Sequence, residues 1–199
     1  MPFLHTMPPP VACAKAGTCM VLSSWSTTSM EEVAAAAVSG LRWFQLYVYK
    51  DRALTEDLVQ RAAASGYKAL CVTIDTPVLG KRREDMRHGF DLPSHLRLAN
   101  FRSEHLQSSL AKVEEEGKAL AGSALFQYTQ KLICSSLTWK DIKWLQDISP
   151  LPIVLKGVLT AEDAKMAVMQ RVDGIMVSNH GARQLDGVPA TVSSTRLVM

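Results

Sequence analysis

The feature that most constrains the fold is a repeated alternation of a short apolar segment, a capped helical segment and a glycine or polar turn. The apolar segments predict strands that begin near residues 19, 43, 69, 152 and 173. They are separated by 24, 26, 83 and 21 residues, and three of these spacings match one βα unit. Such units form parallel sheets with right-handed crossovers. The sequence therefore predicts an α/β fold with about five βα units, in a chain shorter than the about 250 residues of a complete (β/α)8 barrel.

Hydroxyl residues that precede helical segments predict where the helices begin. The expected helix starts are Ser29, with a capping box to Glu32 and a helix to Val38; Thr55, before residues 56–65; Thr138, before a helix that contains Trp144; and Thr160, before a helix to Met169. Residues 1–10 contain several prolines and are expected to be extended, with a short helix over residues 11–16.

Polar residues follow the predicted strands, where the carboxyl ends of parallel strands place them on one face of a sheet. They are Ser23, Ser24, Gln45, Tyr47, Thr73, Asp75, Lys156, Ser178, His180 and Arg183. Taken singly, each also fits a structural role, as a hydrogen-bonded core group, a core aromatic or a surface side chain. Taken together, they predict a binding site.

The most specific string runs from Ser178 to Gly187 after an apolar segment. Its His180 can exchange protons near neutral pH, and Arg183, three residues later, can pair with a carboxylate through two hydrogen bonds. The pair therefore suits a small anionic ligand that loses a proton.

This string resembles the motif S-N-H-G-x-R-Q-L-D of the FMN-dependent 2-hydroxy-acid oxidases and dehydrogenases, the glycolate oxidase family. Further matching fragments follow in family order: Ser23-Ser24-Trp25, Phe44-Gln45-Leu46-Tyr47, Thr73-Ile74-Asp75-Thr76-Pro77 and Leu155-Lys156-Gly157. The resemblance implies a partial (β/α)8 TIM barrel of the FMN-linked oxidoreductase type. It also implies that FMN contacts the side chains of Ser23, Gln45, Thr73, Lys156 and Ser178.

The same resemblance assigns the chemistry to five residues. Tyr47, Arg82 and Arg183 are implied to bind the substrate, His180 to act as general base, and Asp75 to orient the imidazole ring. The implied reaction is oxidation of a small (S)-2-hydroxy acid to a 2-oxo acid, with oxygen as the expected acceptor and hydrogen peroxide as a product. A homo-oligomer, a tetramer in the family, and a peroxisomal location are also implied. The chain shows no targeting signal, so the cytoplasm is the other expected location.

The resemblance divides the chain into an atypical N-terminal segment 1–17, a partial FMN hydroxy acid dehydrogenase domain 18–191 and a divergent C-terminal tail 192–199. Residues 86–135 form an insertion, either a lid over the site or a segment without such a role. The family's D-G-G-V-R phosphate segment and a later G-R pair do not occur. We therefore hypothesise a truncated product, an alternatively spliced product or an incompletely assigned gene, whose isolated chain binds FMN weakly. The alternative is a catalytically incomplete isoform that acts through interaction with full-length subunits.

Composition excludes other classes of function. A net charge of +3 is too small to predict nucleic-acid binding. No apolar run is long enough to predict a membrane span. The four cysteines fit no metal-ligand spacing, so no metal site is expected, and they are expected to be reduced. A phosphate-binding barrel of another chemistry has no support beyond the shared architecture.

Overall fold

The computed structural model describes residues 8–88, 92–93, 95–101 and 131–198. The strands are β1 (Met20–Ser23), β2 (Arg42–Leu46), β3 (Leu70–Thr73), β4 (Ile153–Val158) and β5 (Gly174–Val177). The helices are α1 (Pro9–Lys15), α2 (Met30–Ala36), α3 (Arg52–Ala64), α4 (Arg83–His88), α7 (Trp139–Ile148), α8 (Ala161–Met169) and α9 (Thr191–Val198), with a short 3₁₀ helix η1 (His180–Ala182).

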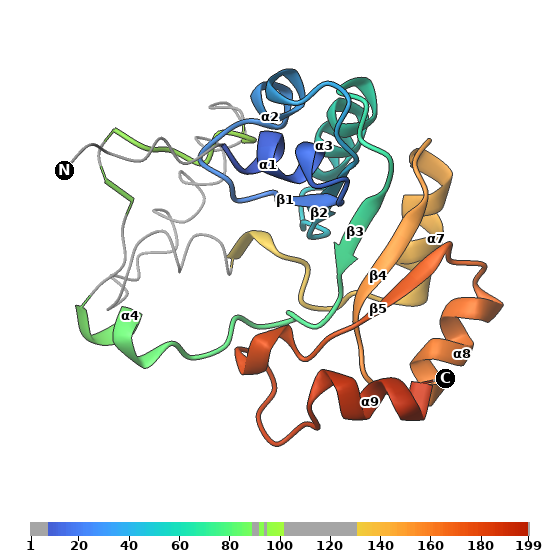
Figure 1. The fold of residues 1–199 in the computed structure, drawn as a ribbon. Helices are drawn as coiled ribbons and strands as arrows, with labels where there is room; N and C mark the ends of the chain where they lie inside the picture. The colour runs from blue at the N-terminus through green and yellow to red at the C-terminus, as the bar shows by residue number, and fades with distance from the viewer. Residues whose placement is uncertain (1–7, 89–91, 94, 102–130, 199) are drawn as a thin grey trace.

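The five strands form one parallel sheet in the order β1-β2-β3-β4-β5. Figure 1 shows α1, α2 and α3 beside β1 and β2, and α7 and α8 beside β4 and β5. Each pair of neighbouring strands is joined by a crossover that contains a helix, as parallel pairing requires. The predicted α/β fold with five βα units of a barrel is therefore confirmed.

Alternation along the strands separates the core from the site. In β2, Phe44 and Leu46 are fully buried, whereas Gln45 between them is only partly buried and faces the other side of the sheet. Burial of each of these apolar side chains contributes about 1.5–3 kcal/mol. In β4, Leu155 is likewise fully buried in the core, whereas Lys156 is only partly buried and faces the other side of the sheet. The apolar face of the sheet thus builds the core, and the opposite face carries polar groups.

Three of the predicted helix starts are confirmed. Ser29 and Glu32 form the expected capping box at α2. Thr138 precedes α7, where Asp141 completes a second capping box. Thr160 accepts the backbone N–H of Asp163 at the start of α8. Most other strand and helix ends differ from the expected bounds by one or two residues, as boundaries commonly do.

The prediction that Thr55 caps a helix over residues 56–65 is wrong. The helix α3 begins at Arg52, and the side chain of Asp51 accepts the backbone N–H groups of Ala53 and Leu54. A carboxylate caps a helix start at least as well as a hydroxyl, so the earlier position prevails. Thr55 lies inside the helix, fully buried, where its Oγ1 accepts the backbone N–H of Tyr49 at 3.0 Å.

The extended segment predicted through residue 10 is also wrong at its end, because α1 begins at Pro9. Proline lacks only an N–H group that the first helical turn leaves unpaired in any case, so it is tolerated there. Residues 1–7 lie outside the described residues. At the other end of the chain, the tail expected over residues 192–199 forms most of α9, for which no helix was predicted.

Part of the predicted insertion 86–135 packs against the body of the protein. Asn100 is fully buried: its Oδ1 accepts the backbone N–H of Met30 at 2.8 Å, and its Nδ2 donates to the carbonyl of Ser24 at 3.2 Å. Phe101 packs edge-on against Tyr49. The helix expected around residues 111–121 lies outside the described residues, and the lid role stays a prediction.

Candidate active site

Strand register places the predicted site residues side by side. Ser23 on β1 pairs with Gln45 on β2. Thr73 on β3 pairs with Lys156 on β4, and Lys156 pairs with Met176 on β5. Because these positions are neighbours across the parallel sheet, their side chains emerge together at its carboxyl edge.

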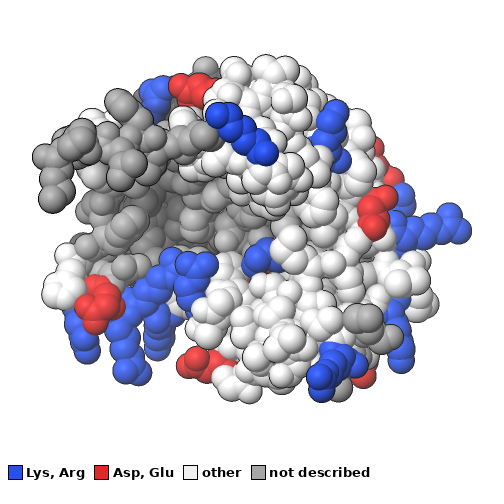
Figure 2. Space-filling view, in the orientation of Figure 1, with Lys and Arg blue, Asp and Glu red and all other residues white. Residues whose placement is uncertain are grey.

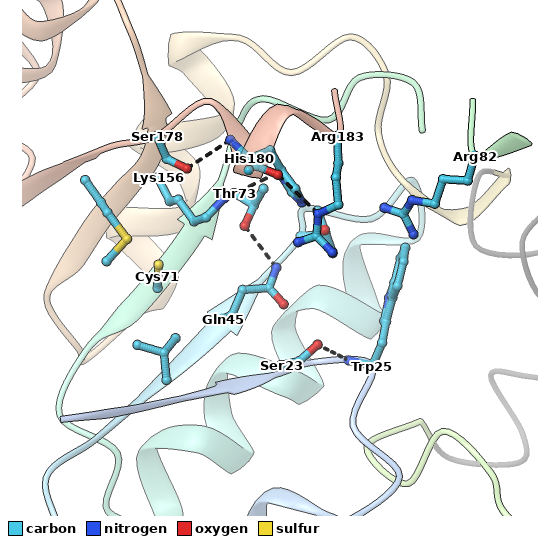
Figure 3. Close-up of a pocket in the computed structure, with 14 residues that line it drawn as sticks. Ser23, Trp25, Gln45, Cys71, Thr73, Arg82, Lys156, Ser178, His180 and Arg183 are labelled. Atoms are coloured by element: carbon cyan, nitrogen blue, oxygen red, sulfur yellow. Dashed lines mark hydrogen bonds between the residues drawn. The ribbon is translucent and has the colours of Figure 1, made fainter. Parts of the chain in front are cut away.

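At this edge lies a cavity of about 570 Å³. This volume falls within the range of roughly 300–1,000 Å³ that is usual for small-molecule and cofactor sites. The residues that line the cavity and had been predicted as site residues are Ser23, Gln45, Tyr47, Thr73, Arg82, Lys156, Ser178, His180 and Arg183. Figure 3 shows their side chains converging from the strands and from the turn after β5. The tenth predicted residue, Asp75, contacts the ring of His180.

A cluster of three ionisable groups lies at the centre of the site. The His180 Nδ1 atom is 2.8 Å from Oδ1 of Asp75 and 3.3 Å from Nζ of Lys156, and that Nζ is 3.6 Å from Oδ2 of Asp75. The side chains of His180 and Asp75 are each only 11% exposed. An Nδ1–H that donates to Asp75 leaves Nε2 as the unprotonated nitrogen, which can accept a proton from a ligand.

The environment keeps Asp75 ionised. Burial opposes its charge, but the hydrogen bond with His180 and the positive charge of Lys156 outweigh burial and lower the pKa of the carboxyl group below its ordinary value. An ionised Asp75 both orients the imidazole ring and stabilises its protonated form.

The turn after β5 is strained, and its own side chains hold it. The φ angles of His180, Gly181 and Ala182 are 58°, 63° and 57°. The left-handed conformation costs roughly 1–2 kcal/mol for a residue with a Cβ atom. Ser178 Oγ accepts the N–H of His180 at 3.0 Å, and Asn179 Oδ1 accepts the N–H of Gly181 at 3.1 Å. The motif therefore stabilises the turn that presents the histidine.

Two arginines and a tyrosine form one side of the cavity. Figure 3 shows the guanidinium groups of Arg82 and Arg183 reaching toward the same space. Arg183 Nε donates to the carbonyl of His180 at 3.2 Å, and the Nε atom of Arg82 is buried without a hydrogen-bond partner among the described residues. Burial, with the charge of Asp75, raises the pKa of Tyr47, so its hydroxyl stays a hydrogen-bond donor. Such groups match a carboxylate.

The surroundings of the cavity are basic. Figure 2 shows Lys and Arg side chains at the edge of the hollowed face, in the region where Figure 1 places α4 and the segment before it. That stretch contains Lys81, Arg82, Arg83 and Arg87 against two acidic residues, Glu84 and Asp85, and Arg87 pairs with Glu84 at 2.9 Å. A cationic edge of this kind favours the approach of anionic ligands.

Sequence reasoning assigned no role to five residues that also line the cavity: Val21, Trp25, Cys71, Met176 and Gly181. Strand alternation could have found three of them, since Val21, Cys71 and Met176 each lie two residues before a predicted site residue. Trp25 stacks against Tyr47 with ring centroids 4.9 Å apart. It belonged to a quoted motif fragment, but its direction depends on the loop after β1.

The fold and the site together define a barrel-type α/β protein with a histidine, a lysine and two arginines around one cavity at the carboxyl ends of its strands. A sequence model described as FMN-dependent dehydrogenase matches residues 10–198. The chain belongs to this family of FMN-dependent dehydrogenases.

Relatives and solved structures agree with this assignment. The chain is 52% identical to 2-hydroxyacid oxidase 1 of Mus musculus over 181 residues, which cover 91% of this chain and 48% of the relative. It is 52% identical to glycolate oxidase 1 of Zea mays over 188 residues, covering 94% and 48%. A crystal structure of mandelate oxidase with (S)-4-hydroxymandelic acid aligns with a TM-score of 0.81 and 36% identity, covering 95% and 50%. The chain thus spans about half the length of these proteins.

The polar groups that line the cavity are of the kinds that could hold the ring portion of FMN, the cofactor named in the family's description. Gln45 Nε2 donates to Thr73 Oγ1 at 3.0 Å, and Gln45 Oε1 accepts the backbone N–H of Ser24 at 3.2 Å, so the amide is held at the cavity wall. Lys156 adds a positive charge beside these groups. Amide, hydroxyl and ammonium groups can serve the polar edge of a flavin ring.

No helix in the described ranges has both the length and the apolar composition of a membrane span. Among the same residues, no group of three His, Cys, Asp or Glu side chains is arranged to hold a metal ion.

Proposed function

We propose that this site oxidises a small (S)-2-hydroxy acid to the corresponding 2-oxo acid with FMN. The observation that carries the proposal is the His180 ring, held at Nδ1 by Asp75 at 2.8 Å, beside a cavity that two arginines and a tyrosine also line. The combination of a proton acceptor and a carboxylate site is what a 2-hydroxy acid requires.

The substrate is oriented by its carboxylate. Arg82 and Arg183 bind its oxygens, and the hydroxyl of Tyr47 donates a further hydrogen bond. This arrangement places the C2 hydroxyl near Nε2 of His180, which would take up the hydroxyl proton, while the C2 hydrogen and the two electrons would pass to the bound flavin. Asp75 then faces an imidazolium ion and stabilises it.

In this proposal Ser23, Gln45, Thr73, Lys156 and Ser178 hold FMN. When bound, FMN supplies the two-electron acceptor, and oxygen then takes the electrons and is reduced to hydrogen peroxide. The charge of Lys156 favours an anionic reduced ring. The proposal extends, by the family resemblance, to a homo-oligomer, a tetramer, and to a peroxisomal location.

The test is an absorption spectrum of the purified chain after addition of FMN and removal of free flavin. A bound flavin spectrum that bleaches when glycolate is added without oxygen supports the proposal. Stable, folded protein that retains flavin but is never bleached by glycolate, L-lactate or (S)-mandelate contradicts it.

The role of His180 is tested separately. We expect His180→Ala to lower the rate of flavin reduction at least 1,000-fold while flavin binding changes little, because the ring acts on a proton and does not hold the cofactor's phosphate. His88→Ala is the matched control, because the His88 side chain is 75% exposed. Equal rates in His180→Ala and in the control would refute the assignment.

A second candidate function rests on the edges of the sheet. Within the described residues, β1 and β5 each pair with one strand only, and Val21 and Ile175 on these strands are 41% and 37% exposed. Unpaired parallel edges favour pairing with another chain. In this alternative, the protein is catalytically incomplete and associates with full-length subunits of a related oxidase. Co-purification with such a subunit, without bound flavin on this chain, would support the alternative over the enzyme.

A further inference from the structure

We propose that Gln184 is a positioning residue, which holds the loop that carries Arg82 against the turn that carries His180 and Arg183. The inference deepens the proposed function and rests on it for its catalytic meaning. Gln184 lies in the string after β5, but it does not line the cavity. Its effect on a substrate must therefore pass through other residues.

The side-chain amide of Gln184 makes three contacts with the backbone of one loop. Its Oε1 accepts the N–H of Gly80 at 3.0 Å. Its Nε2 donates to the carbonyl of Val78 at 2.8 Å and to the carbonyl of Asp75 at 3.2 Å. Donor and acceptor atoms at the end of one side chain are needed for this pattern, and among side chains of this length only glutamine has both.

Gly80 allows the loop to lie directly on the turn. A Cβ atom at this position would be 2.0 Å from the carbonyl oxygen of Arg183 and 3.1 Å from its carbonyl carbon. Both atoms belong to the backbone, so they cannot rotate away as a side chain could. The close approach and the Gln184 contacts therefore join the same two segments at the same place.

These contacts control the relation between the two arginines. Arg82 follows Gly80 by two residues, and Arg183 directly precedes Gln184. Both guanidinium groups face the cavity. Because a carboxylate must meet both groups at hydrogen-bond distance, a loop that moves by about 1 Å weakens binding strongly. Gln184 thus sets the spacing of the anion site without touching the anion.

The first experiment measures amide hydrogen exchange at Gly80 by NMR, which requires neither flavin nor turnover. Gln184→Leu keeps the approximate size and removes all three contacts, so exchange at Gly80 should become about tenfold faster. Gln146→Leu is the matched control. Gln146 lies on α7, away from the cavity, and its side-chain amide also donates to two backbone carbonyls, those of Gln170 and Arg171. Exchange at Gly80 should not change in this control.

Gln184→Glu separates the two halves of the amide. Its carboxylate can still accept the N–H of Gly80, but it faces the carbonyls of Val78 and Asp75 without a proton to donate. We expect exchange at Gly80 to accelerate in this variant as well, because repulsion between the carboxylate and the two carbonyl groups loosens the loop although the acceptor for the Gly80 N–H remains. Exchange at Gly80 equal to wild type in both variants, each still folded, would overturn the proposal.

The second readout separates positioning from general stability. With FMN bound, Gln184→Leu should raise the KM for glycolate about tenfold, with kcat changed less than about threefold, while the control keeps both values. Gly80→Ala, which displaces the loop and with it the N–H that Gln184 accepts, should raise KM in the same way. A fall in kcat alone would overturn the proposal.

If Gln184→Leu does not fold, Gly80→Ala decides. Its loop amides should exchange faster than those of wild type, and unchanged exchange would overturn the proposal. Failure of the proposed function would give a different result. Wild-type protein that binds FMN but shows no turnover would refute the oxidase activity, and hydrogen exchange at Gly80 would still decide the role of Gln184.

Discussion

Replacing Gly157 by alanine tests the packing that places the candidate base. Gly157 follows Lys156 at an irregularity in the pairing of β4 with β5, and its φ angle is 110°. A Cβ atom at this position would lie 2.6 Å from Cβ, 2.7 Å from Cγ and 2.9 Å from Oδ2 of Asp75. Ordinary contact begins near 3.4 Å, so Asp75 or the strand has to move by several tenths of an ångström.

The expected cost has two parts. Forcing alanine into a conformation that favours glycine costs roughly 1–2 kcal/mol, and inserting a methyl group into a filled space costs roughly 1–3 kcal/mol. We therefore expect Gly157→Ala to lower the free energy of unfolding by about 2–5 kcal/mol. For a chain of this size, that corresponds to a decrease in Tm of about 4–20 °C. The displaced carboxylate also loses its 2.8 Å contact with His180.

Denaturant unfolding measures the effect, and two other glycines separate its parts. At Gly174 a Cβ atom would make only ordinary contact, 3.5 Å from the side chain of Val154. At Gly66 the φ angle is 78° and no atom lies within 4 Å of the added Cβ. Gly66→Ala should therefore show the conformational cost alone. The reasoning is refuted if Gly157→Ala unfolds with the same free energy and m-value as Gly174→Ala.

Three further predictions concern other parts of the chain. Asp75→Asn should lower the free energy of unfolding by about 2–4 kcal/mol at pH 7. Because the pKa of Asp75 is lowered in the folded state, this advantage of wild type should be full above about pH 4 and vanish as the pH falls through the lowered pKa. A difference in free energy that does not depend on pH would contradict this. Burial raises the pKa of Cys71 to about 11, so a thiol reagent at pH 8 should modify half-buried Cys134 before Cys71, and simultaneous modification would show that the sheet opens. Ser29→Ala should remove the capping box with Glu32 and lower the free energy of unfolding by about 1 kcal/mol; an unchanged Tm would contradict this.

Much of the site was predictable because parallel strands impose a simple rule. Gln45, Thr73 and Lys156 follow or end apolar segments, and the carboxyl ends of such segments must meet at one edge of a parallel sheet. The roles of these residues toward FMN and substrate stay predictions. The helix starts at Ser29, Thr138 and Thr160 were predictable for a similar reason, since a cap involves residues only three positions apart.

The errors arose where several local signals competed. Asp51 and Thr55 are both good caps, and the choice between them depends on the burial of α3 against the sheet. Pro9 looked like a barrier to helix formation, whereas it is favourable at a first turn.

The sequence by itself determined the number and order of the βα units, the polar groups at their ends and the turn that presents His180, because these depend on short-range periodicity and local hydrogen bonds. Tertiary structure decided which distant groups meet. Asp75 and His180 lie 105 positions apart, and Gly80 and Gln184 lie 104 apart. Their contacts follow from the register of β3, β4 and β5 and from the space that Gly157 and Gly80 leave open, which no local pattern encodes.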